Sequence, residues 1–210
     1  LAPKTLAAID AADVPSIVDA AFGLLSAAQV SGLTPAQFAA IDDSALATFG
    51  ADQGAAITSA QIKLLDASAI DNLSGEAVLA LSPAAISAIP TATFYKLDPT
   101  AFSSFTAAQI AAITPAQLAT LDDTTVGTAN TATATQAGAF GIEQAAALKP
   151  AQVVKMKSFD AASLSSDAIG ALTPASAASL NLDGFASLQA SYLTAAQAPA
   201  MTSKQMAMLD

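Results

Sequence analysis

The sequence predicts an all-α protein, a solenoid of short helices built on an octad repeat. Three observations support this prediction. Apolar residues recur every eight residues along most of the chain, a residue with a helix-capping side chain follows most of them, and proline often comes next. A fixed period of this kind is typical of repeat architectures, in which each unit buries its apolar face only against its neighbours.

The first and sixth positions of the octad form the two apolar rows. The first position is occupied by Leu1, Ile9, Ile17, Leu25, Leu33, Ile41, Phe49, Ile57, Leu65, Leu73, Leu81, Ile89, Leu97, Phe105, Ile113 and Leu121. The sixth is occupied by Leu6, Val14, Phe22, Val30, Phe38, Leu46, Ile62, Ile70, Val78, Ile86, Phe94, Phe102, Ile110, Leu118 and Val126, and Gly54 interrupts the row. These two rows are the predicted core.

One octad, residues 33–40, explains the pattern. Thr34 is a favoured helix N-cap, and Pro35 suits the first helical position because its missing N–H has no partner there anyway. Gln37 then falls at the third position, where Thr34 and Gln37 can form a reciprocal capping box. The same pairing fits Ser26/Gln29, Thr58/Gln61, Thr106/Gln109, Thr114/Gln117, Thr194/Gln197 and Thr202/Gln205. In other octads the predicted caps are Asp42, Asp66, Asp98 and Asp122.

A single continuous helix is the alternative interpretation. Two apolar positions in eight imply about 4 residues per turn, whereas an α-helix has about 3.6, so the apolar stripe would leave any one face. The prolines would also break such a helix repeatedly, at roughly 3 kcal/mol each. We therefore expect one helix of about six residues per octad. Helices of that length are unstable alone, so the array must fold as a stack.

The period continues to the end of the chain with two changes of spacing, so we expect a single elongated domain over residues 1–210. The segment Leu121–Phe140 spans three residues more than two octads, and residues 124–140 are predicted to be irregular. The segment Leu188–Leu193 is three residues short of an octad, which predicts a register slip at 188–193. Leu1 and Leu209 both take the first octad position, so we expect a mature product or a part of a longer array.

A weaker period of 24 residues overlies the octad. It is carried by Thr- and Ser-rich caps at Thr34, Thr58, Ser82 and Thr106. This spacing suits three octads per turn of the solenoid, and two per turn is the alternative.

Composition narrows the range of partners. The net charge is −10, the basic residues are all lysine, and there is no arginine, histidine or cysteine. Phosphate contacts dominate affinity for nucleic acid, and basic clusters attract anionic lipid, so neither partner is expected. No run approaches the roughly 18 apolar residues of a membrane-spanning helix, so we expect no membrane insertion.

No residues stand out as catalytic, cofactor-binding or metal-binding. Histidine and cysteine are missing as bases and nucleophiles, so we expect no enzyme, and the pair Lys157-Ser158 is interpreted as surface residues. The pairs Asp42-Asp43 and Asp122-Asp123 suggest Ca²⁺, which needs six to eight oxygen ligands. We interpret each pair instead as an N-cap followed by an acid in the first turn.

Two further features bear on the surface. The segment Asn72-Leu73-Ser74 fits the glycosylation sequon, although Leu73 takes a core position and Ser74 a cap position. The two tyrosines, Tyr95 and Tyr192, are the candidates for an exposed aromatic contact. They belong to an alternative function, a solenoid that binds a peptide or glycan.

Two resemblances follow from these motifs. The segments Leu33-Thr34-Pro35-Ala36-Gln37 and Ile113-Thr114-Pro115-Ala116-Gln117 resemble the opening of a transcription-activator-like effector repeat. Those repeats are about four times longer than the octad, carry a base-reading residue pair and are basic. This chain shares none of these properties, so we do not expect it to read DNA.

The segment Phe105–Ile113 is similar to the Ala/Thr/Gln-rich short repeats of large bacterial surface and secreted proteins. This resemblance implies an extracellular structural protein, a filament, adhesin stalk or matrix component, and it carries no site residues. The expected partners are copies of the chain itself, associated end to end or laterally.

Overall fold

The computed structural model describes residues 3–17, 19–97, 104–121, 139–154, 164–180 and 190–209. Within these ranges every regular element is a helix of three to six residues, and none is a strand. The predicted all-α class and the predicted short helices are confirmed. Many helices have four residues, fewer than expected, because the cap and the connecting residues take up half of their octad.

The chain divides into two compact units, Leu1–Ala101 (unit 1) and Phe102–Asp210 (unit 2). Each unit is described by itself, and the prediction of one elongated domain stays a prediction. The helices of unit 1 are α1 (Pro3–Leu6), η1 (Ala11–Ser16), α2 (Asp19–Phe22), α3 (Ala27–Gly32), α4 (Pro35–Ala39), α5 (Asp43–Leu46), α6 (Ala51–Ala56), α7 (Ser59–Ile62), α8 (Ala67–Asn72), α9 (Gly75–Ala80), α10 (Pro83–Ala88) and α11 (Thr91–Phe94).

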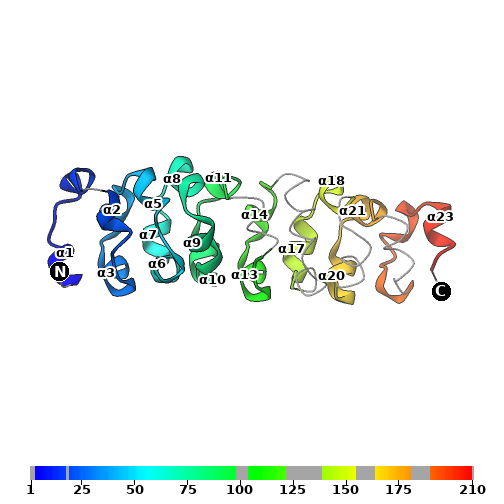
Figure 1. Ribbon diagram of the computed structural model, residues 1–210. Helices are drawn as coiled ribbons and strands as arrows, with labels where there is room; N and C mark the ends of the chain where they lie inside the picture. Colours follow the sequence, from blue (N-terminus) through cyan, green and yellow to red (C-terminus); the bar gives the residue numbers. More distant parts are fainter. Residues whose placement is uncertain are drawn as a thin grey trace. The chain divides into compact units, whose positions relative to one another are not determined.

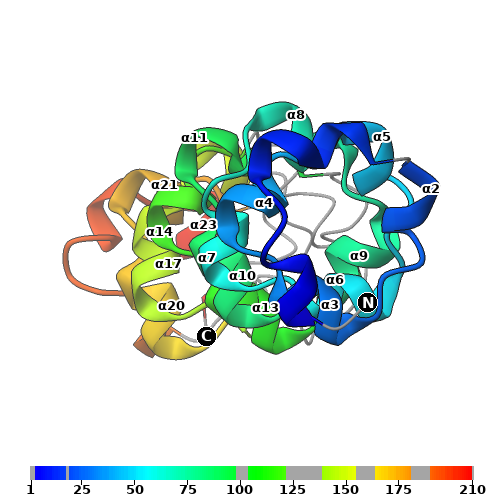
Figure 2. The same ribbon diagram turned by 90° about the vertical axis from the view of Figure 1, so that its left-hand side faces the viewer.

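Helices in unit 1 pack against helices one 24-residue period away (Figure 1). The contacts link α1, α3, α6 and α9 in one row, η1, α4, α7 and α10 in a second, and α2, α5, α8 and α11 in a third. We call three successive helices, one from each row, a triplet. The four triplets begin at α1, α3, α6 and α9. Figure 2 views unit 1 from its N-terminal end, with the three rows placed around a common interior.

That interior is filled by the two predicted apolar rows. In the second triplet Leu33, Ile41 and Leu46 are buried, and the rings of Phe38 and Phe49 meet edge to face with centroids 6.1 Å apart. Some first-position residues are half-buried instead of buried: Ile9, Ile17, Leu25, Leu193, Met201 and Leu209.

Gly54, which interrupts the sixth-position row, has a steric reason. A Cβ atom at this position would lie 2.3 Å from the carbonyl oxygen of Ala77 and 2.5 Å from the Cα atom of Ala77. Helices α6 and α9 therefore approach each other so closely that only glycine fits at Gly54. The break in the sequence pattern thus marks a very close contact between two helices.

Most predicted capping boxes are present. Both halves form at Ser26/Gln29, Thr34/Gln37, Thr58/Gln61, Thr106/Gln109, Thr114/Gln117 and Thr202/Gln205. Asp66 also caps as predicted, accepting from the Ala69 N–H at 2.9 Å. Asp98 and Asp122 lie outside the described residues.

Two capping predictions were wrong in part. Asp42 stands at the N-cap of α5 but makes no side-chain cap bond. The Ala45 N–H bonds to the Asp42 backbone carbonyl instead, at 2.9 Å, which tightens the first turn. At Thr194/Gln197 only the glutamine half forms, and the Gln197 N–H bonds to the Thr194 carbonyl at 3.0 Å.

Unit 2 contains α13 (Ala107–Ala112), α14 (Pro115–Leu118), α17 (Ile142–Ala147), α18 (Pro150–Val153), α20 (Ser166–Ala171), α21 (Pro174–Ala178), η2 (Ala190–Tyr192), η3 (Ala198–Ala200) and α23 (Ser203–Met206). One row of contacts links α14, α17, α20 and η2, and another links α18, α21 and η3. Of the predicted irregular residues 124–140 only the last two are described, and of 188–193 only 190–193. Among the helices described in both units, none is long and apolar enough to cross a bilayer.

Candidate functional site

The feature that recurs most often is a buried glutamine at the third helical position. Gln37 on α4 is 1% exposed, and its Oε1 accepts from the Thr34 N–H at 2.8 Å. Its Nε2 donates to two carbonyls of the preceding triplet, those of Leu6 at 2.9 Å and Ile9 at 2.5 Å. One side chain thus closes its own helix and binds an earlier triplet. We call this arrangement a glutamine tie.

Unit 1 repeats the tie at two further helices. Gln53 on α6 donates to the carbonyls of Phe22 (2.8 Å) and Leu25 (3.1 Å), so this tie runs from the first helix of the third triplet to the end of the first triplet. Gln61 on α7 donates to those of Val30 (2.7 Å) and Leu33 (3.0 Å). Each of these three ties reaches back 31 and 28 residues. Since a buried amide without partners is costly, these bonds are what makes glutamine tolerable in the core.

The residue at the cap position matters less than the glutamine. Gly50, Gly141 and Lys149 occupy cap positions in place of threonine, serine or aspartate. Their backbone N–H groups still donate to the Oε1 of the glutamine three residues later, at 2.8 to 2.9 Å. Lys149 adds a bond from its Nζ to the Ala119 carbonyl, at 2.5 Å.

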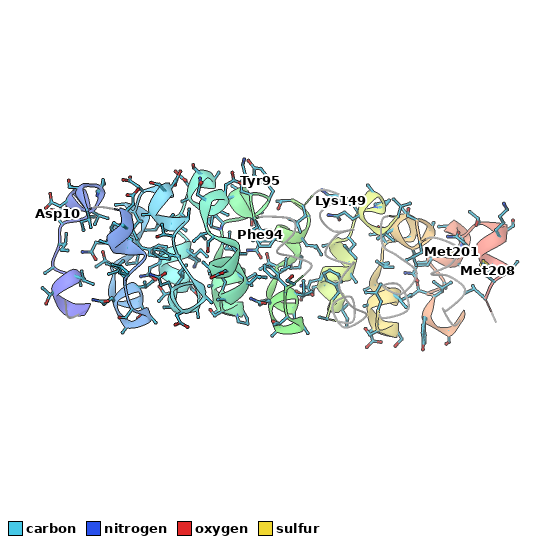
Figure 3. All side chains as sticks on the ribbon, viewed as in Figure 1. Asp10, Phe94, Tyr95, Lys149, Met201 and Met208 are labelled. Carbon is cyan, nitrogen blue, oxygen red and sulfur yellow. The ribbon has the colours of Figure 1, made fainter. Side chains whose placement is uncertain are left out.

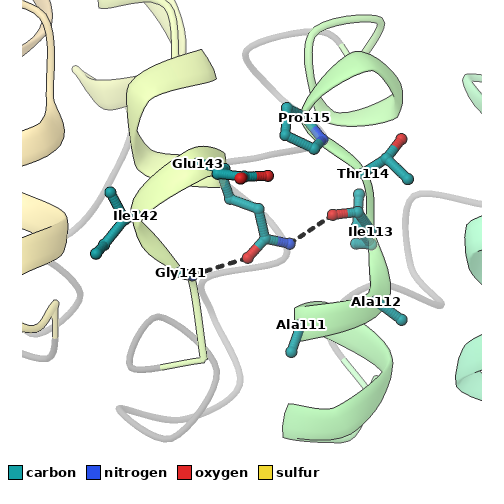
Figure 4. Close-up of a pocket in the computed structure, with 9 residues that line it drawn as sticks. Ala111, Ala112, Ile113, Thr114, Pro115, Gly141, Ile142 and Glu143 are labelled. Carbon is teal, nitrogen blue, oxygen red and sulfur yellow. Dashed lines mark hydrogen bonds between the residues drawn. The ribbon is translucent and has the colours of Figure 1, made fainter.

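Unit 2 keeps the tie although the spacing of the repeat changes. Gln144 donates to the carbonyls of Ile110 and Ile113, and dashed lines in Figure 4 mark hydrogen bonds at Gly141 and Ile113. Gln144 and Gln152 reach back 34 and 31 residues, three more than in unit 1. Gln197 reaches back 28 to Ile169 and 25 to Leu172, three fewer. The tie therefore follows its place in the stack and not a fixed count of residues.

Other helices carry a small residue at the third position and use hydroxyl groups instead. The Ser74 hydroxyl donates to the Phe49 carbonyl, and Ser176 donates to the Leu148 carbonyl at 2.7 Å. On the surface, Ser44 donates to the Asp19 carboxylate at 2.5 Å, and Ser68 donates to the Asp43 carboxylate. The three bonds in unit 1 each join one triplet to another, and the Ser176 bond in unit 2 joins α21 to the residue that ends α17.

The aspartate pairs do not gather into a metal site where the structure describes them. The Asp43 carboxylate accepts from Ser68, and no group of three or more possible metal ligands occurs in the described ranges. Asp122-Asp123 and Lys157-Ser158 lie outside those ranges. In the sequon, Asn72 is exposed and donates to the Ser68 carbonyl at 3.0 Å, while Leu73 is buried.

The two tyrosines belong to different units. Tyr95 is 53% exposed, its ring lies 5.7 Å from the Lys96 ammonium, and the neighbouring Phe94 is buried (Figure 3). Tyr192 is half-exposed and lines a groove of about 520 Å³ in unit 2. The groove also includes Ile142, Ser166, Asp167, Gly170 and Thr194.

A second open groove of unit 2, about 730 Å³, runs along residues 111–115 and 141–144 (Figure 4). The Gln144 amide in its lining already makes three hydrogen bonds, so it offers little to a ligand.

No protein-family model matches this chain, and no curated protein matches it.

Proposed function

We propose that the chain is a structural repeat protein, a solenoid in which each triplet forms one turn. Copies associate end to end or laterally into a filament, an adhesin stalk or a matrix. The observation that carries the proposal is the glutamine tie. Since the amide makes two of its bonds to the preceding triplet, each tied helix depends on a neighbouring triplet for its buried polar group.

The packing supports the solenoid part of the proposal. Three rows of helices with a 24-residue period are what a chain produces when it winds at three octads per turn. The longer and shorter reaches of Gln144 and Gln197 also fit a solenoid, because a turn can take up three residues more or fewer without losing its ties. A stack of this kind grows by adding turns, which suits a spacer or fibre.

The extracellular location rests on the resemblance of Phe105–Ile113 to repeats of bacterial surface and secreted proteins. Packing and ties, not disulfides, hold such a stack, because the chain has no cysteine. The net charge of −10 favours solubility and limits nonspecific contacts. Specific association of copies must therefore come from matching surfaces.

Scattering and microscopy of the purified protein test the proposal in two parts. Small-angle X-ray scattering is expected to give an extended particle, and a maximum dimension typical of a compact globule of this mass would refute the solenoid. Light scattering and electron microscopy over a wide range of concentrations are expected to reveal association into fibres. A strictly monomeric particle at every concentration would refute self-association and leave the solenoid standing.

A second proposal is a binding module for a glycan or peptide, and the Tyr192 groove favours it. Aromatic faces and nearby hydrogen-bonding groups are the usual chemistry of such sites. The groove combines the half-exposed Tyr192 with the Asp167 carboxylate and the Thr194 hydroxyl.

Binding to a panel of oligosaccharides and peptides, followed by NMR, tests this alternative. Tyr192→Ala is expected to abolish any binding that is found. Tyr95→Ala is the matched control, because Tyr95 is also exposed but lies in unit 1. Equal binding by both variants would show that the groove is not the site.

A further inference from the structure

The two units contain stretches that match each other. Residues 49–89 of unit 1 and 140–180 of unit 2 correspond at a constant shift of 91 residues. The same shift relates the starts of α6 and α17, α7 and α18, α9 and α20, and α10 and α21. Identical residues at matched positions include Phe49/Phe140, Gly50/Gly141, Gln53/Gln144, Gln61/Gln152, Ser74/Ser165 and Pro83/Pro174. Described positions of unit 2 can therefore be compared with counterparts in unit 1.

Gly170 within α20 stands where α9 has Leu79, whose side chain is 40% exposed. Glycine within a helix is destabilising relative to alanine, because it loses more conformational freedom on folding. The backbone does not need glycine here, since the φ angle of Gly170 is not positive. Packing does not need it either. An added Cβ atom would lie at ordinary contact distances, 3.6 Å from the Tyr192 carbonyl oxygen and 3.7 Å from the Thr194 Cγ2 atom. What the missing side chain provides is open space beside η2.

That space belongs to the groove of about 520 Å³ that Tyr192 also lines. The groove runs over α20 between α17 and η2, so it lies along the side of this row of helices and not at its end. Ile142 is 56% exposed and lines both this groove and the groove along residues 111–115. Figure 4 shows the Ile142 side chain on the side of α17 away from Pro115. The two grooves thus meet at an exposed apolar side chain, where unit 1 has Ala51.

The charged side chains of the two grooves are acidic. Among the described lining residues, Asp167 is the charged one in the Tyr192 groove and Glu143 in the adjoining groove. Both acids also stabilise the first turns of their own helices, but that role requires neither Gly170 nor an exposed Ile142. An aromatic face beside a carboxylate suits a guanidinium group, which stacks on rings and forms paired hydrogen bonds with carboxylates.

We propose that the joined grooves bind an extended peptide segment that carries an arginine and, two positions away, an apolar residue. Side chains two positions apart lie on the same face of an extended chain. The guanidinium contacts Tyr192 and Asp167, and the apolar side chain contacts Ile142. Because this chain has no arginine, the partner is a different protein and not a second copy. The inference rests on the second proposed function, the binding module, and it does not require self-association.

Titration with the peptide acetyl-Leu-Ala-Arg-Ala-Leu-amide, followed by NMR, tests the proposal. The peptide has an apolar residue on each side of the arginine, so it can bind in either direction. Saturable shifts are expected in the Gly170 and Thr194 amide resonances and in the Ile142 methyl resonances. The same peptide with glutamine in place of arginine is expected to bind roughly tenfold more weakly or worse. Added salt should weaken binding of the arginine peptide more than that of the glutamine peptide.

Variants that copy unit 1 make the test specific to the groove. Gly170→Leu introduces the residue of α9 and fills the groove, so it is expected to weaken binding roughly tenfold or more. Its melting temperature should stay the same or rise, because a glycine leaves the helix. Asp167→Asn adds no volume, and it is expected to weaken binding and remove most of the salt dependence even if the leucine variant does not fold. Glu76→Gln is the matched control, since Glu76 is the counterpart of Asp167 in unit 1, and it should leave binding unchanged.

The outcomes separate this inference from the proposed function on which it rests. The inference is overturned if the arginine peptide gives no saturable shift, or if it binds no better than the glutamine peptide. It is also overturned if folded Gly170→Leu binds the arginine peptide as well as the unaltered protein does. If chitotetraose or maltotetraose shifts the same resonances and the arginine peptide does not, the peptide is the wrong occupant and the binding module stands. If no peptide or glycan binds, both are refuted.

Discussion

Helices α4 and α7 differ from helices α8, α9 and α10 at one buried position. The first two carry Gln37 and Gln61 there, and the others carry Ala69, Ala77 and Ala85. All five positions are buried. The glutamine helices are joined to the preceding triplet by side-chain bonds that span the gap. The alanine helix α9 comes close enough to α6 for its backbone to contact Gly54.

This difference shows that helices of different triplets can be held together either by the hydrogen bonds of a polar side chain or by close contact of their backbones. Glutamine demands three well-placed partners, because a buried amide that is only partly satisfied is worse than none. Alanine demands no partners, but it leaves no room for extra atoms. Polar changes should therefore damage the first kind of junction, and added volume should damage the second.

The largest effect is expected from Gly54→Ala. The added Cβ would overlap the backbone of Ala77, which cannot rotate away, so α6 and α9 must separate. We expect a loss of about 3 kcal/mol in the free energy of unfolding, measured by urea denaturation. Gly75→Ala is the matched control, because no atom lies within 4 Å of its Cβ position, and it should change stability by less than about 1 kcal/mol. Equal effects of the two changes would contradict the close-contact junction.

The next largest effect is expected from Gln61→Leu. It removes the partner of the Thr58 N–H and both donors to the Val30 and Leu33 carbonyls. We expect a loss of roughly 2–3 kcal/mol in the same denaturation measurement. Gln61→Glu separates capping from tying, since a carboxylate still accepts from Thr58 but cannot donate at neutral pH. A glutamate variant as stable as the unaltered protein would mean that the tie has little weight.

The smallest effects are expected at the serines that join the alanine helices. Ser74 both caps α9 at 3.0 Å and donates to the Phe49 carbonyl, so Ser74→Ala should cost about 1 kcal/mol or slightly more. Ser68 donates to Asp43 at the exposed surface, so Ser68→Ala should cost less than about 0.5 kcal/mol. Thermal melting of the two variants side by side measures the difference. The reverse order would contradict the view that buried junctions carry the stability.

The parts that sequence could predict are those decided within one octad. The capping box at Thr34 and Gln37 and the two apolar rows depend on neighbouring residues, so their spacing was enough to find them. The sequence analysis predicted that the glutamines cap their own helices, but it missed that they also donate to backbone carbonyls of an earlier triplet. Those carbonyls lie 31 and 28 residues earlier in the chain, outside the octad of the glutamine. The signal was present in the 24-residue period, which together with a buried Gln37 points to partners about one period earlier in the chain.

Other features depend on packing that a single octad does not reveal. Gly54 looked like an irregularity until its distance to Ala77 was known, and the Ala45 N–H bonds to the Asp42 backbone carbonyl and not to the Asp42 side chain. Self-association, the extracellular location and the single domain stay predictions.

The glutamine ties run in one direction, always from a later residue to carbonyls made earlier in the chain. During synthesis the acceptors of each tie leave the ribosome before the donor does. Every new triplet can thus settle on a surface that is already folded, without waiting for sequence still to be translated.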